Sequence, residues 1–408
     1  MEEANEFFLT LLLILLFARL FGELAAWLKV PSVMGEMLAG IVLGPSLLGW
    51  VEPTRIVQTL AEIGLILLLF EVGLETDLGR LAGAGRKASI VAVGGFVAPF
   101  AFGFAASLWM FDLPLMVALF VGGTLTATSI GVTVRVLKDL NRQKAPEAQV
   151  VLGAAVLDDI LGVVLLAMLY EFSLGGGINL VNASKVLIFI AIFMVLAPIV
   201  AKIMARILGH YDQISKLEGV IPTTIVSLVL FFAWVAHAVG APALLGGFTA
   251  GLALSRRFFL PFGVALLREN HDFVHRIEHV MKPIIHLFTP IFFVAVGLSL
   301  NLREVDWSSS TTLWMSAVLI VVAVLSKLGG ALFIREPLPF RMAVGIAMIP
   351  RAEVGLIFAE LGRVSGVFDN DLYAVLIITI AVTTILPPFM LKWFYARFEH
   401  RLPAQDSG

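Results

Sequence analysis

The chain has no cysteine and few charged residues. Without cysteine it can hold neither a disulfide nor a thiolate metal site, and it has no cysteine nucleophile. Charged residues make up 14% of its 408 residues, against roughly 25% in a soluble domain. The net charge of −2 offers no basic surface, so we expect no nucleic-acid partner.

Two functional motifs are also missing from the sequence. There is no G-x4-G-K-[ST] stretch, and this argues against transport driven by ATP at a Walker A site. There is no filter sequence resembling T-V-G-Y-G, and this argues against a potassium channel.

Apolar residues, at 59% of the chain, occur in long blocks. About 20 consecutive apolar residues cross the hydrocarbon of a bilayer, and the blocks predict an all-α membrane protein with about thirteen spans. The expected spans are 6–28, 32–49, 58–75, 88–109, 114–135, 148–172, 184–206, 217–239, 242–255, 283–301, 312–334, 341–363 and 371–396.

The lysines and arginines predict the orientation of these spans. With the N-terminus outside, 21 of them fall on the inner side, 4 on the outer side and 3 within spans. This bias favours an N-out, C-in protein of the bacterial cytoplasmic membrane. The first block follows the acidic Glu2 and Glu3 and no A-x-A site comes after it, so we expect a span and not a cleaved signal.

An internal repeat links the second and ninth expected spans. Both read P-x3-G-x3-A-G-x2-L, from Pro31 and from Pro242, and the third and tenth both end V-G-L-x3-L. Matching spans lie seven apart, so the two copies have opposite topology, as is typical of secondary transporters. Small-residue packing between helices is the simpler explanation of one such match, but two matches in the same order favour a repeat.

Two of the expected spans are interrupted in the middle. The fifth contains a hydroxyl-rich run that includes Thr126, Thr128 and Ser129, and the twelfth contains Pro350-Arg351-Ala352-Glu353. Corresponding interrupted helices are the best pointer in a sequence to a transport site. Arg351 and Glu353 would offset the dipoles of the half-helices; direct binding of an ion by Glu353 is an alternative.

Asp158 and Asp159 lie in the middle of the sixth expected span. A charge at the bilayer centre is costly, and such residues usually have a function. Lys327, in the middle of another span, is the natural partner of Asp158. We expect the two aspartates to hold either Na⁺ (or Li⁺) or protons, with no cofactor. A buried pair that only joins helices is the structural alternative, and a lysine that only balances charge is another.

Two further groups of ionisable residues have less certain roles. Glu71 ends the third span and could line an access path, but a solvated position near the interface is the expectation. His271, His275 and His279 share a helical face in the inner loop 256–282. Their spacing could bind a metal or sense pH, but we expect the wet face of an interfacial helix.

The chain resembles the cation:proton antiporter 2 family, and in particular the NapA-like electrogenic sodium/proton antiporters. The resemblance extends over nearly the whole chain. It rests on the following stretches: 31–45, F-E-V-G-L-E-T at 70–76, T-A-T-S-I-G at 126–131, G-A-A-V-L-D-D at 153–159, Lys327-x-Gly-Gly, and P-R-A-E-V-G-L-I at 350–357.

The resemblance implies a NhaA/NapA-like homodimer with two crossed broken helices. Asp159 would be the main ion and proton carrier, Asp158 would pair with Lys327, and Thr126, Thr128 and Ser129 would lie at the crossing. Spans four to six and eleven to thirteen would move as an elevator-like core. The implied divisions are 1–110 (mainly dimerisation), 111–173 (core), 174–310 (linker and second-repeat dimerisation helices), 311–398 (core) and 399–408 (tail).

The sequence departs from the family pattern at two positions. Glu71 stands where close relatives are expected to have an apolar residue, and Ala352 stands where P-R-G-E is usual. Kef-like potassium relatives have a C-terminal nucleotide-binding domain; the chain ends about a dozen residues after its last expected span, so we expect none.

Three other functions are alternatives to Na⁺/H⁺ exchange. K⁺/H⁺ exchange of the Kef-like kind remains an alternative, because carboxylates and hydroxyls serve both ions. An intramembrane aspartyl protease takes its two aspartates from different helices, whereas here they are adjacent, so no enzyme is expected. A substrate-binding sensor is the remaining alternative.

Overall fold

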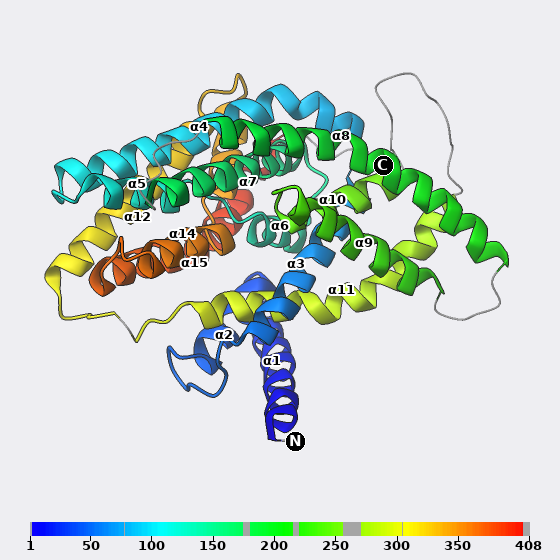
Figure 1. Ribbon diagram of the computed structural model, residues 1–408, viewed down its shortest axis with the longest axis horizontal. Coiled ribbons are helices and arrows are strands. Elements are labelled where there is room, and N and C mark those ends of the chain that lie inside the picture. The colour runs from blue at the N-terminus through cyan, green and yellow to red at the C-terminus, as the bar shows by residue number, and fades with distance from the viewer. Residues whose placement is uncertain are drawn as a thin grey trace. The chain divides into compact units, whose positions relative to one another are not determined.

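The computed structural model describes residues 2–76, 78–173, 180–214, 220–255, 271–303 and 305–402. Within these ranges the regular structure is entirely helical (Figure 1). The helices are α1 (Glu2–Trp27), α2 (Ser32–Leu43), α3 (Arg55–Glu75), α4 (Leu78–Trp109), α5 (Leu115–Thr126), α6 (Ile130–Asp139), α7 (Pro146–Ser173), α8 (Leu180–Ile214), α9 (Val220–Ala238), α10 (Ala243–Leu254), α11 (His271–Ser299), α12 (Ser310–Ala331), α13 (Leu338–Ala347), α14 (Glu353–Val364) and α15 (Asn370–Phe398).

The described helices have the length and composition of membrane spans. Nine helical segments are long and apolar enough to cross a bilayer, and α2, α10 and α13 are apolar but shorter. Each expected span coincides with a helix or with a pair of shorter helices. The chain is therefore a multi-pass membrane protein, as its composition predicts.

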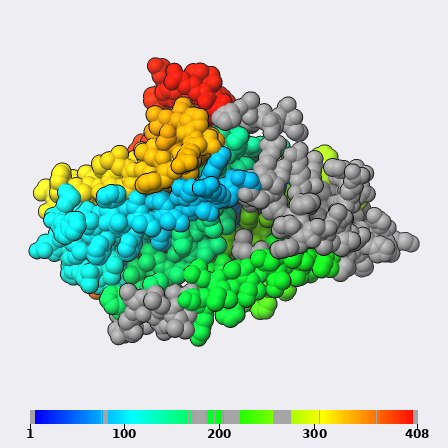
Figure 2. Space-filling model, turned by 90° about the horizontal axis from the view of Figure 1, so that it is seen from above, coloured from blue at the N-terminus to red at the C-terminus, as the bar shows by residue number. Residues whose placement is uncertain are grey.

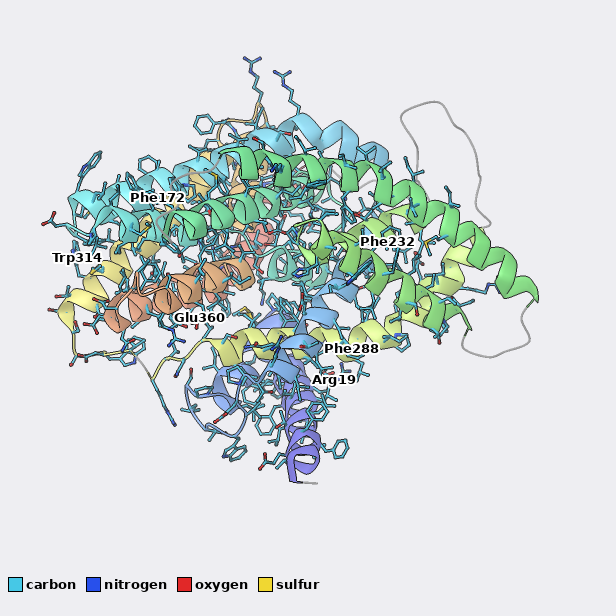
Figure 3. The ribbon with its side chains drawn as sticks, viewed as in Figure 1. Arg19, Phe172, Phe232, Phe288, Trp314 and Glu360 are labelled. Atoms are coloured by element: carbon cyan, nitrogen blue, oxygen red, sulfur yellow. The ribbon has the colours of Figure 1, made fainter. Side chains whose placement is uncertain are left out.

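The tryptophan side chains lie on the surface of the protein. All seven are more than half exposed, from Trp307 at 54% to Trp27 at 85%. Several lie at helix ends, such as Trp109 at the end of α4 and Trp314 in the first turns of α12 (Figure 3). Tryptophan is enriched where a bilayer meets water, so exposed tryptophans near helix ends are typical of a membrane protein.

The chain divides into two compact units, 1–54 with 84–180 and 293–408, and 55–83 with 181–292. In the first unit, α5, α7, α12, α14 and α15 share a hydrophobic core (Figure 1). Phe120, Phe358 and Phe368 lie in this core, and each is at most 5% exposed. The rings of Phe120 and Phe368 meet edge to face, 5.9 Å apart, a favourable arrangement for aromatic pairs.

Glycines let α2 approach its neighbours in the first unit to backbone contact. A Cβ atom on Gly40 would overlap the backbone of α11 at Val294 and Gly297, and a Cβ atom on Gly297 would overlap α2 at Met37. Gly35 meets the backbone of α1 at Phe21 in the same way. Small residues in membrane helices allow such close approach, so α2 is held tightly between α1 and α11.

The second unit repeats this contact with the matching residues of the other sequence copy. A Cβ atom on Gly251 of α10 would overlap α3 at Phe70, and a Cβ atom on Gly73 of α3 would overlap α10 at Phe248. Gly246 lies against the α9 backbone at Phe232, labelled in Figure 3. The P-x3-G-x3-A-G and V-G-L motifs therefore make equivalent contacts in the two units.

One expectation outside the aspartate pair is wrong. Glu71 is 5% exposed and not solvated, because the glycine contacts between α3 and α10 cover this part of α3. The histidine run lies in the first turns of α11, which extends from His271 without a break into its apolar half, and its described members His275 and His279 are exposed. The backbone continues through Pro283 and Pro290, since neighbouring helices can hold a proline-containing membrane helix together.

Candidate functional site

Two interrupted helices of the first unit meet at their breaks. One helix stops at Thr126 and resumes at Ile130, and the other stops at Ala347 and resumes at Glu353. Between the breaks, the Ser129 N–H donates to the Pro350 carbonyl at 2.7 Å. The interruptions that the sequence predicts are thus both present and in direct contact.

Backbone groups freed by the breaks find partners across this contact. Met348 and Ala347, at the end of α13, accept hydrogen bonds from the hydroxyls of Thr128 at 3.1 Å and Thr133 at 2.8 Å. The Arg351 carbonyl accepts one from Thr384 of α15. An unpaired backbone group in hydrocarbon costs several kcal/mol, and these hydroxyls remove that cost. Thr133 and Thr384 were not predicted; only their positions in apolar helices could have suggested them.

Arg351 is fully buried at the C-terminal end of α5. Its guanidinium donates twice to the Leu125 carbonyl, at 2.8 and 3.1 Å, and also to Ile349 at 2.8 Å and Ala323 at 3.2 Å. A cation beside the last carbonyls of a helix is favourable, because the partial negative charge of the helix is concentrated there. Arg351 therefore joins α5, the second break and α12 through backbone carbonyls.

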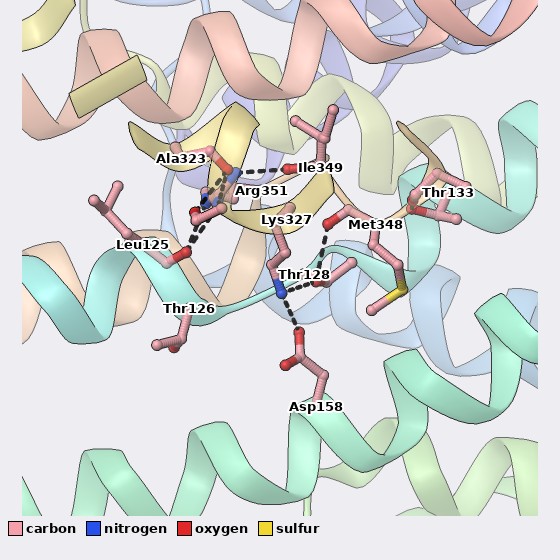
Figure 4. A network of polar contacts seen from close by, with 12 residues as sticks. Leu125, Thr126, Thr128, Thr133, Asp158, Ala323, Lys327, Met348, Ile349 and Arg351 are labelled. Carbon is pink, nitrogen blue, oxygen red and sulfur yellow. Dashed lines mark hydrogen bonds and ion pairs between the residues drawn. The ribbon is translucent and has the colours of Figure 1, made fainter. Parts of the chain in front are cut away.

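Lys327 of α12 lies close to Thr128 of the first break and to Asp158 of α7 (Figure 4). Its Nζ atom donates to Asp158 Oδ2 at 2.9 Å and to Thr128 Oγ1 at 2.7 Å. Both charged side chains are fully buried. A buried ion pair is tolerated only with good geometry and further hydrogen bonds, which Thr128 supplies here.

Asp159 lies beside this pair on α7 and is 2% exposed. Successive residues of a helix point about 100° apart, so Asp159 projects from a different side of α7 than Asp158. The first break thus lies next to two buried acids, of which Asp158 is the one bonded to Lys327. Thr126 and Ser129 belong to the same break; Thr126 Oγ1 donates to the Gly123 carbonyl at 2.8 Å and Ser129 caps α6.

Paired glycines make room for the lysine stem. A Cβ atom on Gly330 of α12 would lie 2.5 Å from the Gly95 nitrogen of α4, and a Cβ atom on Gly95 would lie 3.6 Å from Cδ of Lys327. In Figure 2, α4 in blue to cyan and α12 with α13 in yellow to orange form one continuous surface. Gly95 was not predicted, although the G-G pairs at 94–95 and 329–330 are a visible signal.

The remaining predicted residues lie elsewhere or are not described. Glu353 begins α14, and its side chain lies outside the described part of the structure, as does that of His271. His275 and His279 are exposed, and the described residues contain no group of three His, Asp or Glu side chains placed to hold a metal. Glu71 belongs to the other unit.

A second buried charge cluster lies at the ends of α7 and α15. Arg142 donates to Glu147 Oε1 at 2.6 and 3.1 Å, and the Tyr395 hydroxyl donates to the same oxygen at 3.3 Å. Burial alone would lower the pKa of the Arg142 guanidinium, but its hydrogen bonds to Glu147 raise that pKa above its ordinary value. This cluster fixes the loop before α7 and was not predicted from the sequence.

The described site combines buried acids, a buried lysine and two interrupted helices that meet at their breaks, all within an apolar bundle. This arrangement is typical of a secondary transporter for small ions. The two acids can bind a cation or protons, and the lysine can neutralise one of them when neither is bound. The geometry thus defines the class of protein as an ion-coupled membrane transporter.

Comparison with known proteins identifies the family. The family described as "Sodium/hydrogen exchanger, transmembrane" matches residues 12–397, and the chain belongs to it. The chain is 34% identical over 407 residues to the Na(+)/H(+)-K(+) antiporter GerN of Bacillus cereus, covering 98% of this chain and 99% of that protein. It is 32% identical to the Na(+)/H(+) antiporter of Enterococcus hirae, covering 95% and 98%. The protein is therefore a cation/proton antiporter.

A solved structure agrees with the fold. The sodium/proton antiporter MjNhaP1 of Methanocaldococcus jannaschii superimposes with a TM-score of 0.70, covering 97% of this chain and 98% of that one. Sequence identity is 18%, so this similarity concerns the fold alone.

Proposed function

We propose that the chain exchanges Na⁺, or Li⁺, for protons across the cytoplasmic membrane, and that the exchange is electrogenic. The observation behind this proposal is the contact of Lys327 with Asp158 beside Asp159 at the meeting point of the two breaks. An ionised carboxylate is a hard oxygen ligand suited to Na⁺. Cation and protons compete for the same oxygens, so binding of one excludes the other.

In this proposal, Lys327 is the reason why the proton charge and the cation charge moved in one cycle differ. While the acids are empty of cation, the lysine ammonium stabilises Asp158. A cation that binds between the acids releases the lysine, and an unpaired buried lysine gives up its proton readily. More proton charge than cation charge then crosses the membrane in each cycle. Arg351 stays on backbone carbonyls and would hold the break together throughout.

We further propose the finer architecture that the sequence predicts. The chain would have thirteen spans in two inverted repeats, N-terminus outside and C-terminus inside, and would form a homodimer with an elevator-like core. The matching glycine contacts of α2 with α11 and of α3 with α10 support the repeat. The core would contain the site residues Asp158, Asp159 and Lys327, and its expected limits are 111–173 and 311–398.

Reconstitution into liposomes tests the proposed exchange. With an imposed pH gradient, Na⁺ or Li⁺ should dissipate the gradient, and the Asp159→Asn variant should lose at least about 100-fold in rate, because it can neither bind a proton nor bring charge to the cation. Asp112→Asn is the matched control, since Asp112 is exposed and its positive φ of 52° suits asparagine equally. Native exchange by Asp159→Asn would overturn the assignment.

Potassium belongs in the same assay as a second candidate ion. The name of the GerN relative, Na(+)/H(+)-K(+) antiporter, includes K⁺, and oxygen ligands alone do not exclude this ion. A gradient dissipated by K⁺ and not by Na⁺ would replace the first proposal by K⁺/H⁺ exchange.

A further inference from the structure

A group of four polar side chains lies where α2 begins and α6 ends, away from the two breaks. Asp139 Oδ2 accepts hydrogen bonds from both the backbone N–H and the hydroxyl of Ser32, each at 2.9 Å. Arg135 donates to the Ser32 hydroxyl at 3.0 Å and forms ion pairs with Glu36 and Asp139 at 3.3 Å. We name Ser32, Glu36, Arg135 and Asp139 the α2–α6 cluster.

The cluster replaces a helix cap. The residue before α2 is Pro31, which has no side chain able to cap the helix. The Asp139 carboxylate takes this role from another helix, and a carboxylate at a helix N-terminus is favourable by hydrogen bonding and by charge. The start of α2 is therefore completed by the last residue of α6.

This contact differs from the other contacts of α2. Gly35 and Gly40 bring α2 to the backbones of α1 and α11, and such contacts leave no space for sliding. With α6, in contrast, α2 meets long charged side chains at part-buried positions. The side chains of Arg135 and Asp139 are 17% and 19% exposed, so water can reach them and their separation costs less than that of a fully buried pair. The α2–α6 contact is therefore the face of α2 best suited to open.

α6 is also tied to the candidate ion site. Its N-cap Ser129 bonds to Pro350, and Thr133 in its first turn bonds to Ala347. A displacement of the meeting point of the breaks relative to α2 would therefore take α6 along and break the cluster. Glu36 is 5% exposed, and its Oε2 atom has no hydrogen-bond partner within the described residues, so the closed cluster leaves one polar atom to be satisfied on opening.

We propose that the α2–α6 cluster is a latch that closes in one access state of the transporter and opens in every transport cycle. The inference rests on the proposed exchange function and deepens it, because it names the contact whose opening lets the ion site change sides. By the expected orientation, the start of α2 and the end of α6 both face the cytoplasm. The closed latch then belongs to the state in which the site is shut off from that side.

The absence of cysteine allows a direct test by cross-linking. The double variant Ser32→Cys/Asp139→Cys is reconstituted and oxidised with copper phenanthroline, and Na⁺/H⁺ exchange is measured before oxidation, after it and after reduction. Oxidation should lower exchange about tenfold or more, and the reductant should restore it, since a locked latch stops the conformational step.

A second pair of cysteines controls for cross-linking as such. Lys87 of α4 and Glu336, between α12 and α13, form an ion pair, and α4 meets α12 by backbone contact at Gly95 and Gly330. These elements should move together, so oxidised Lys87→Cys/Glu336→Cys should keep its exchange rate within about twofold. Full exchange by the oxidised 32–139 pair would refute the latch while leaving the proposed function intact.

A second readout follows the opening of the latch directly, in a double variant whose reduced form exchanges ions. The rate of 32–139 disulfide formation is measured with and without Na⁺ across a pH gradient. With Na⁺ present the protein cycles and spends part of the time with the latch open. The rate of disulfide formation should therefore be lower with Na⁺ than without it, by about twofold or more. An unchanged rate would contradict the latch. Absence of Na⁺/H⁺ exchange in the unsubstituted protein would instead count against the proposed function.

Discussion

At the scale of single residues, Lys327 is a charged side chain that is fully buried within the described structure. It is among the largest fully buried side chains, and its ammonium is held by one carboxylate and one hydroxyl. Removing one partner of a buried ion pair typically costs 3–5 kcal/mol, roughly, because a charge remains without compensation. Asp158 can reduce that cost by binding a proton, so loss of the lysine should alter charge movement more than folding.

We therefore expect Lys327→Gln to continue exchange but to lose its response to membrane potential. Without the ammonium, each cycle moves equal proton and cation charge. The measurement is the exchange rate in liposomes at imposed potentials set by a potassium gradient and valinomycin. Lys87→Gln is the control, because Lys87 is half-exposed in its ion pair with Glu336 and should keep the native response. Undiminished voltage dependence in Lys327→Gln would contradict the proposed role.

At the scale of helices, adjacent glycines have very different surroundings. On α12 a Cβ atom at Gly330 would press on the backbone of α4, whereas a Cβ atom at Gly329 would have nothing within 4 Å. The helix turns by about 100° between them, so one faces its neighbour and the other faces away. The close approach of α4 and α12 thus depends on Gly330 alone of the two.

This contrast gives a matched pair of substitutions. Gly330→Ala should push α12 from α4, displace the lysine stem and destabilise the protein by about 1–3 kcal/mol, as overpacking does. Gly329→Ala should be neutral or stabilising by up to about 1 kcal/mol, because alanine favours helix. Thermal unfolding in detergent and exchange in liposomes measure both effects. Equal behaviour of the two variants would show that the backbone contact is unimportant.

The interrupted helices show how one element completes another. Each break receives hydrogen bonds from the other: the hydroxyls of Thr128 and Thr133 donate to carbonyls at the end of α13, and Arg351 donates to the Leu125 carbonyl at the end of α5. Each half-helix pair therefore requires the other, which is consistent with the rule that irregular backbone occurs at membrane depth only inside protein.

At the scale of the whole molecule, the distribution of positive charge predicts which ends of the spans face the cytoplasm. The exposed loop residues Glu52 and Lys144 are expected on opposite sides of the membrane. Because the chain has no cysteine of its own, a thiol reagent can label only the single cysteine introduced at either position.

We expect Glu52→Cys to react with a membrane-impermeant maleimide on intact cells, and Lys144→Cys to react only after the membrane is opened. Short loops rich in lysine and arginine stay inside, which is the reason for the difference. Gel-shift labelling of whole cells and of inverted vesicles provides the measurement. The reverse labelling pattern would mean that the protein is inserted the other way round. The latch would then lie on the outer side of the membrane and not on the cytoplasmic side.

The sequence by itself determined the local features that follow from burial in the hydrocarbon of a bilayer. Apolar blocks predict spans because an unpaired backbone must form helix in a bilayer. The doublet Asp158-Asp159 and Lys327 stand out because charge is rare there, and the two breaks stand out as polar runs within apolar blocks. The repeat was visible as well, since its glycines are needed at fixed spacing for close contact.

Only the tertiary structure decided which of these residues meet. The burial of Glu71, the carbonyls bonded by Arg351, the support of Lys327 by Gly95 and the cluster of α2 with α6 all join segments far apart in the chain. Helical periodicity gives the face on which a residue lies, but not the neighbour that this face meets. In a bilayer that neighbour is selected by close packing and by polar groups that must find partners, and both depend on the assembled bundle.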